Sequence, residues 1–263
     1  MMDTTPLHAL ATLAVGVLTG VLSAAFGIGG AAVSTPAIRA LGVSAVFAVG
    51  TTLPSILPSA VSGTIRYVRE SLVWWRVVAW TAPAGVLTAI LGAVLSRSVP
   101  GEGHWLMIGT AVLLAYTSWR MARRPDQADD QGPSGPRRRD HPALLMAVGA
   151  AAGLLSGLLG VGGGTVMVPG FSELARIPLK TAIACSLVCV GIFAVPATLA
   201  HWSVGDLDWR TAGLLSLGVV PGARLGAVLA IRARARRLRL AVAVFLGVVA
   251  VVYAVSEAVA MVR

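Results

Sequence analysis

Charged residues are scarce in this chain. Asp, Glu, Lys and Arg make up 12% of its 263 residues, about half the share that soluble proteins carry. Stretches such as Leu7–Ile38 and Thr81–Ser96 contain no charged residue, and apolar stretches of this length are typical of membrane spans. With 56% hydrophobic residues and a mean hydropathy of +0.82, the composition excludes an ordinary soluble domain and predicts an all-α polytopic membrane protein.

The chain has only two cysteines, Cys185 and Cys189. They lie four residues apart on one predicted apolar helix, a spacing that forbids an unstrained disulfide and provides only half of a metal site. We expect both to be small packing residues. The sequence indicates neither a metal site nor a cofactor.

Acidic residues are also few, and none is expected near the middle of the membrane. Outside the central polar stretch, the following are predicted in loops or near segment ends: Asp3, Glu70, Glu102, Glu173, Asp206, Asp208 and Glu257. A carboxylate proton relay is therefore not expected.

Two further classes of protein are disfavoured. Gly153–Gly157 lacks the Gly-x-Ser-x-Gly spacing of a serine nucleophile, and Gly160–Gly164 lacks the Lys-Ser/Thr of a phosphate-binding loop. The net charge of +10 could indicate nucleic-acid binding. The basic residues, however, form short clusters between apolar segments, where orientation in the membrane explains them better. We expect neither an enzyme nor a nucleic-acid-binding protein.

Eight apolar segments organise the chain. They cover about 7–38, 44–65, 77–97, 104–120, 142–172, 181–203, 210–231 and 239–261. A polar stretch rich in Pro, Gly and charge separates the fourth from the fifth, which is typical of a flexible linker. The predicted domains are a first transmembrane repeat (1–121), a polar linker (122–141) and a second transmembrane repeat (142–263).

The two halves repeat one another. Gly27–Gly30 aligns with Gly160–Gly163 at an offset of 133 residues, and each run interrupts the first segment of its half. Further along, Leu91–Leu95 matches Leu225–Leu229 in all five positions at an offset of 134. Agreement over about 100 residues predicts a duplicated unit of four segments.

The basic residues indicate how the halves are oriented. If all eight segments crossed the membrane once, the Lys and Arg residues would divide almost evenly between its faces. If each glycine-broken segment instead enters and returns on one side of the membrane, sixteen of the 21 Lys and Arg residues lie on one face and four on the other. The positive-inside rule favours this second arrangement. We therefore expect two inverted four-segment repeats, with the linker and the loop between segments seven and eight in the cytoplasm and both termini outside.

Each glycine run is predicted to break a helix at membrane depth. Paired broken helices are typical of substrate sites in transporters, because unpaired backbone is tolerated there only beside protein or a water-filled cavity. A helix that starts after such a break presents free N–H groups and a positive dipole end, which suit an anion. The candidate substrate-binding residues are Gly29, Gly30, Gly162, Gly163, Gly164 and Thr165.

An alternative role for glycine is to let membrane helices pack closely. We expect that role for Gly16, Gly20, Gly149 and Gly153.

Side chains could add to the anion site. Arg224 lies in an otherwise uncharged stretch, Gly213–Ala230, where an arginine costs at least roughly 2.5–3.5 kcal/mol. We expect it to face a cavity with a bound anion; the alternative is that it extends to the lipid headgroups. Thr51, Thr52 and Ser186 lie among apolar residues in the second segment of their halves. Their hydroxyls could coordinate an oxyanion or bond back to helix carbonyls.

These features resemble the sulfite exporter TauE/SafE family of bacterial membrane transporters. The resemblance covers roughly residues 10–260 and is most specific in the run Gly157–Gly164 followed by Pro169; in the first half, Ala31 stands where Gly164 stands in the second. It implies secondary transport of small sulfur-containing anions such as sulfite, sulfonates or sulfoacetate across the bacterial cytoplasmic (inner) membrane.

The sequence thus predicts a permease that works by alternating access between its halves. A membrane potential that is negative inside favours export of an anion, whereas uptake would need coupling. The alternatives are a channel-like anion conduit and an uptake permease for a different small organic anion. The predicted partners are a small anionic substrate and the lipid bilayer, and no pattern bears on the oligomeric state.

Overall fold

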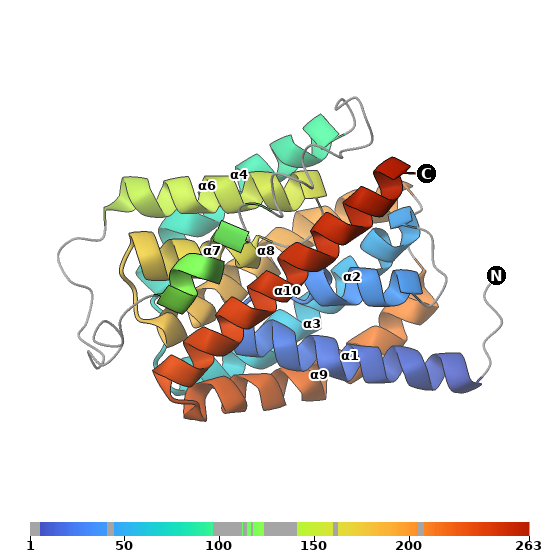
Figure 1. Ribbon diagram of the computed structural model, residues 1–263, viewed down its shortest axis with the longest axis horizontal. Helices are drawn as coiled ribbons and strands as arrows, with labels where there is room; N and C mark the ends of the chain where they lie inside the picture. The colour runs from blue at the N-terminus through green and yellow to red at the C-terminus, as the bar shows by residue number, and fades with distance from the viewer. Residues whose placement is uncertain are drawn as a thin grey trace.

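The computed structural model describes residues 6–40, 45–96, 112, 115–116, 118–123, 141–159, 163–204 and 208–262. Within these ranges all regular structure is helical (Figure 1), which confirms the predicted all-α class. The helices are α1 (Pro6–Phe26), α2 (Ala31–Ala40), α3 (Ala45–Arg69), α4 (Trp75–Ser96), α6 (Pro142–Leu159), α7 (Gly164–Pro169), η2 (Gly170–Leu174), α8 (Leu179–Val204), α9 (Trp209–Arg232) and α10 (Ala235–Val262).

The first segment of each half is an interrupted helix, as predicted. α1 ends at Phe26 and α2 starts at Ala31, whereas α6 ends at Leu159 and α7 starts at Gly164. α7 then continues directly into η2, a single π-helical turn. We call residues 27–30 the first break and residues 160–163 the second break.

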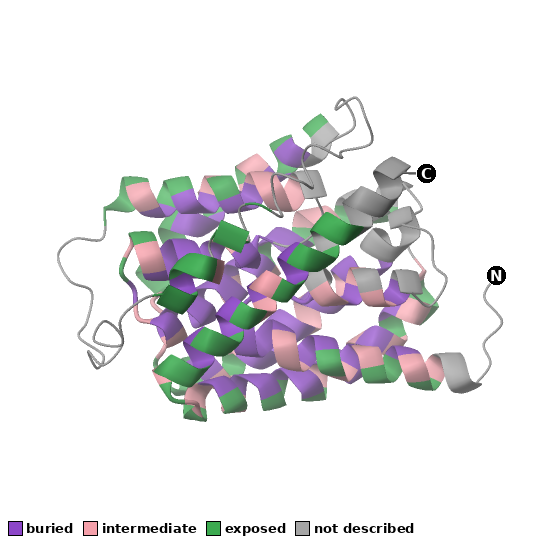
Figure 2. Cartoon of the chain, viewed as in Figure 1, coloured by how far each residue is buried: buried purple, intermediate pink, exposed green. Residues whose placement is uncertain are grey.

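Four of the described helices are long and apolar enough to cross a membrane. The apolar windows are Ala9–Phe26 of α1, Trp75–Gly92 of α4, Leu179–Leu199 of α8 and Trp209–Arg232 of α9. Many large apolar side chains are exposed, and Figure 2 shows exposed positions on the outer helices around a buried interior. Because lipid tails are as apolar as a leucine side chain, an apolar exterior of this kind agrees with a multi-pass membrane protein.

Close helix contacts join the two halves. α1 packs along α9, and α6 packs along α4. A β-carbon added at Gly16 would lie 2.7 Å from the Leu215 carbonyl oxygen, and one added at Gly149 would press on the Thr81 carbonyl oxygen. The glycine four residues later on each helix makes the equivalent contact. The prediction that these four glycines let helices approach closely is confirmed.

α8 lies in the middle of the fold, where it contacts α3, α4 and α7. Residues 181–187 of this helix are all buried. Cys185 and Cys189 are buried free thiols, and the backbone N–H of Trp74 approaches the Cys185 Sγ at 3.3 Å. Both cysteines are small packing residues, as predicted.

The helices run back and forth along the long axis of the molecule (Figure 1). α1 starts at the right-hand end of the view, whereas α6 starts at the left-hand end, so the two run in opposite directions. The end of α10 lies at the same end as the start of α1, and the turn between α9 and α10 lies at the other end.

Candidate functional site

The first break reverses the chain between α1 and α2. Gly27, Gly29 and Gly30 have φ angles of +70°, +83° and +81°, a region that residues with a β-carbon rarely adopt. The backbone N–H groups of Val33 and Ser34 both donate to the Gly30 carbonyl at 2.9 Å. As at the start of any α-helix, the amides before Val33 have no acceptor within the helix. The first turn of α2 therefore presents amide donors to the first break.

Hydroxyl side chains from α1 and α3 lie around the first break. The Ser59 hydroxyl donates to the Ser23 hydroxyl at 3.0 Å. A β-carbon added at Gly30 would lie 2.9 Å from the Thr19 Cγ2 and 3.5 Å from the Ser23 Oγ. These side chains and the glycine backbone thus form one polar group, which we call the first-break cluster: Thr19, Ser23, Gly29, Gly30 and Ser59.

Thr19 stands out within the first-break cluster. Its side chain is 2% exposed, and its hydroxyl oxygen has no hydrogen-bond partner among the residues that the structure describes. Leaving a buried hydroxyl without a partner costs about 1–3 kcal/mol, so such an atom requires an explanation. The Thr19 side chain packs through its methyl carbon, Cγ2, beside Gly30 at the start of α2, where free amides and the helix dipole already favour an anion. A bound oxyanion would satisfy the hydroxyl and the amides together.

The second half meets the first break through Gly164. A β-carbon added at Gly164 would press on the Gly27 carbonyl oxygen and would lie 2.7 Å from the Ile28 Cα. Ser186 of α8 donates its hydroxyl to the same Gly27 carbonyl at 2.8 Å. Thr165, next in the chain, is 3% exposed. The structure therefore brings Gly164 and Ser186 to the first break.

Gly163 packs toward α6 and not toward the first break. A β-carbon added there would lie 2.7 Å from the Ala152 carbonyl oxygen of α6. Its φ of −62° and ψ of −7° are ordinary right-handed helical values, and no side chain caps α7. The six-residue α7 buries Met167 and Val168. Gly162 lies outside the described residues.

Thr51 and Thr52 are both buried but make different contacts. The Thr52 Oγ1 lies 3.2 Å from the Thr35 Oγ1, which joins α3 to α2. Thr51 accepts a hydrogen bond from the backbone N–H of Asp208 at 3.2 Å, directly before α9. Thr52 thus lies against the helix that follows the first break, whereas Thr51 fixes the start of α9.

Arg224 does not face the first break. Its side chain is exposed, whereas the preceding residue, Ala223, is buried. A β-carbon added at Gly20 of α1 would lie 2.8 Å from the Ala223 nitrogen, so this is the face of α9 that packs on α1. The rotation of α9 directs Arg224 away from α1, which favours the alternative in which it extends toward lipid headgroups.

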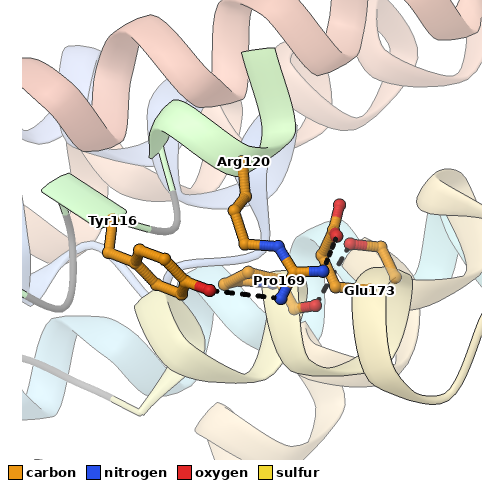
Figure 3. Close-up of polar contacts among 5 residues, drawn as sticks. Tyr116, Arg120, Pro169 and Glu173 are labelled. Carbon is orange, nitrogen blue, oxygen red and sulfur yellow. Dashed lines mark hydrogen bonds and ion pairs between the residues drawn. The ribbon is translucent and has the colours of Figure 1, made fainter. Parts of the chain in front are cut away.

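One carboxylate near the second break is mostly buried. Glu173 lies near the end of η2, as predicted, but its side chain is only 12% exposed, and its carboxylate lies 3.5 Å from the Arg120 guanidinium. Arg120 also donates to the Tyr116 hydroxyl at 3.5 Å. Figure 3 shows Arg120 reaching between Tyr116 and Glu173, close to Pro169. The ion pair thus ties the helical stretch 118–123 to η2.

Three residues of the first-break cluster, Thr19, Ser23 and Ser59, were not among the predicted ligands. Thr19 and Ser23 are four residues apart on α1, so they share a helix face. On α3, Ser59 belongs to the row Ser55, Ser59 and Ser62, whose spacing of four and three also marks one face. This helical spacing of hydroxyls was the signal available in the sequence.

The chain matches a known family along most of its length. The family described as "Sulfite exporter TauE/SafE" matches residues 12–253. The chain belongs to the sulfite exporter TauE/SafE family.

Relatives of this TauE/SafE-family chain carry transporter names. It is 30% identical over 231 residues to a probable membrane transporter protein of Xylella fastidiosa, covering 85% of each chain. It is 26% identical over 232 residues to the probable membrane transporter protein YunE of Bacillus subtilis, covering 80% of this chain and 83% of the relative. A probable membrane transporter protein of Methanocaldococcus jannaschii is 21% identical over 255 residues, covering 89% and 91%. No solved structure matches the chain.

The TauE/SafE-family chain is therefore a multi-pass membrane transporter. In the part that the structure describes, no three His, Cys, Asp or Glu side chains gather as metal ligands would. The first-break cluster instead offers hydroxyl and amide groups, which donate hydrogen bonds to anionic oxygens.

Proposed function

We propose that this TauE/SafE-family transporter carries small sulfur-containing anions, of the sulfite, sulfonate or sulfoacetate type, across the cytoplasmic membrane. The observation that carries the proposal is the buried Thr19 hydroxyl, which has no hydrogen-bond partner among the described residues, on a side chain whose methyl group packs beside Gly30 at the start of α2. Oxyanions of sulfur present several acceptor oxygens to such donors, and hydrogen bonds to charged acceptors are the stronger ones.

The first-break cluster and the first amides of α2 would bind the substrate oxygens. Thr52, with Thr35, extends this row of hydroxyls along α2. We assign the opposite wall of the site to Gly164 and Thr165, and to Ser186 the role of holding the Gly27 carbonyl. We assign no substrate contact to Arg224 or Thr51.

During transport, two inverted repeats would move relative to each other. The breaks lie at equivalent positions, equivalent glycines meet equivalent carbonyls across the halves, and α1 and α6 run in opposite directions (Figure 1). Inverted repeats around a shared site are typical of alternating access. Rocking of one half against the other would then open the first-break cluster to each side in turn, with the linker and the α9–α10 turn on the cytoplasmic side.

Export is the direction that the membrane potential favours. A potential that is negative inside contributes about 2.3 kcal/mol per charge per 100 mV to the outward movement of an anion. This driving force needs no coupling ion. Glu173, the mostly buried carboxylate, is paired with Arg120, and we give it no part in coupling.

Flux through proteoliposomes tests the proposal. Vesicles with purified protein would be loaded in turn with sulfite, sulfate, thiosulfate and short sulfonates. We expect saturable efflux and counter-transport for at least one of the sulfur anions. Flux that neither saturates nor shows counter-transport would favour the channel-like conduit, and no flux of any of these anions would refute the proposal.

An imposed potential tests the direction. A valinomycin-induced potassium potential of 100 mV, negative inside, should shift the steady-state distribution of a monoanion outward by up to about fiftyfold. Inward accumulation against this potential would instead favour the uptake permease.

A further inference from the structure

The outward face of α9 is apolar apart from arginine. Exposed positions on this helix recur at 217, 221, 224, 225, 229 and 232, the spacing of a single helix face. Leu217, Leu225 and Leu229 are 68%, 57% and 60% exposed. In a bilayer this face meets lipid chains, so Arg224 is a cation placed among them, where it requires a negatively charged partner.

Further arginines continue this face at the turn into α10. Arg232 ends α9, about 12 Å along the axis from Arg224, and Arg234 and Arg237 are exposed just beyond it. The sequence contains no acidic residue between Asp208 and Glu257. We name this set the arginine surface: Arg224, Arg232, Arg234 and Arg237.

We propose that the arginine surface binds an anionic phospholipid. The lipid phosphate would lie between Arg224 and Arg232, and its acyl chains would run past Leu225 toward Leu217. A phosphate drawn toward Arg224 removes the cost of an unpaired cation beside lipid chains. A soluble anion lacks the acyl chains that would carry it to this depth, and α9 and the turn provide no carboxylate.

The headgroup should carry a net negative charge. A zwitterionic lipid also has a phosphate, but its ammonium group is repelled by the positive field that the turn creates. Each basic side chain near a surface of anionic lipid strengthens attachment. The arginine surface is distinct from the first-break cluster, and this binding is independent of the transported substrate.

Native mass spectrometry of the full-length, detergent-solubilised protein tests this proposal. Phosphatidylglycerol and phosphatidylcholine would be titrated separately, and their dissociation constants compared. We expect wild type to bind phosphatidylglycerol several times more tightly than phosphatidylcholine. Arg224→Gln and Arg232→Gln should each weaken phosphatidylglycerol binding by about fivefold and leave phosphatidylcholine binding unchanged.

Two control variants separate a local site from a general effect of charge. Arg210→Gln removes one exposed arginine from the other end of α9 and should leave phosphatidylglycerol binding unchanged. Arg224→Lys keeps the charge and should retain most of the binding. The proposal is overturned if wild type binds both lipids equally, or if Arg210→Gln weakens binding as much as Arg224→Gln does. Because Arg224 is exposed, unchanged elution volume and helical circular dichroism should show that its variants are folded.

Discussion

The two breaks occupy equivalent positions in the sequence, yet the described residues at each break have different surroundings. The first break has three glycines with positive φ and is lined by the side chains of Thr19, Ser23 and Ser59. The described end of the second break, Gly163, has ordinary helical angles. The chain beyond it buries apolar side chains, among them Met167 and Phe171. The helices are thus interrupted at equivalent positions, whereas Gly163, the described end of the second break, packs on Ala152 of α6.

This difference indicates that the two halves of the chain have different roles at the site. Donors without partners gather at the first break, which we propose as the binding side. The second half supports it, since Gly164 approaches Gly27 and Ile28, Ser186 bonds to Gly27, and Arg120 holds η2 through Glu173. Changing these supports should weaken the first break, with the largest effect at Gly164 and the smallest at Arg120.

Gly164→Val should have the largest effect. Its side chain would overlap the Gly27 carbonyl, and overpacking of this kind costs about 1–3 kcal/mol or more. The expected result is a large loss of correctly folded protein, measured by the elution profile of heated, detergent-solubilised samples. Gly213→Val is the matched control, because a β-carbon at Gly213 meets no atom within 4 Å. An equal loss in both variants would mean that contact between the breaks is not the cause.

Ser186→Ala should have an intermediate effect. It removes the donor to the buried Gly27 carbonyl, and a buried acceptor left without a partner costs about 1–3 kcal/mol. Ser216→Ala is a suitable comparison, since the Ser216 hydroxyl bonds back to the Ala212 carbonyl of its own helix and should contribute little. Thermal unfolding of the two variants measures the difference. Equal stability would show that Ser186 does not support the first break.

Arg120→Gln should have the smallest effect on stability. The Arg120 side chain is 44% exposed, and ion pairs that reach solvent contribute about 0.2–1 kcal/mol. A double-mutant cycle with Glu173→Gln measures the coupling between the two side chains. Arg123→Gln is the control. It removes an arginine from the same helical stretch whose guanidinium lies over the Trp119 ring, 4.4 Å from its centroid, instead of pairing with Glu173. A coupling of zero would remove the ion pair as a support for η2.

Much of the fold could be predicted from the sequence. Long uncharged stretches mark helices that cross an apolar medium, and clustered glycines mark the places where a helix ends. The interruptions before Ala31 and Gly164 and the close approach at Gly16 and Gly149 follow from these local properties. They require no knowledge of which helices are neighbours.

The composition of the site depends on neighbours and was harder to predict. Arg224 was expected to face a cavity, but whether it does so depends on the rotation of α9, which is set by Gly222 and Ala223 packing on α1. The role of Thr19 also could not be predicted from its own helix alone. Its hydroxyl could have bonded back to its own helix, and only the folded structure reveals that no described residue serves as its partner.

The most direct test of the account is sulfur-anion flux by Thr19→Val in proteoliposomes. A hydrogen bond to a charged group contributes about 1.5–3 kcal/mol, so the KM for the transported anion should rise at least about tenfold. Heat stability should not fall, because the hydroxyl has no partner in the described part of the protein. Thr88→Val, whose hydroxyl bonds to the Ala84 carbonyl of its own helix at 3.0 Å, should transport as wild type does. Unchanged flux by Thr19→Val, or an equal loss in Thr88→Val, would contradict a binding site at the first break.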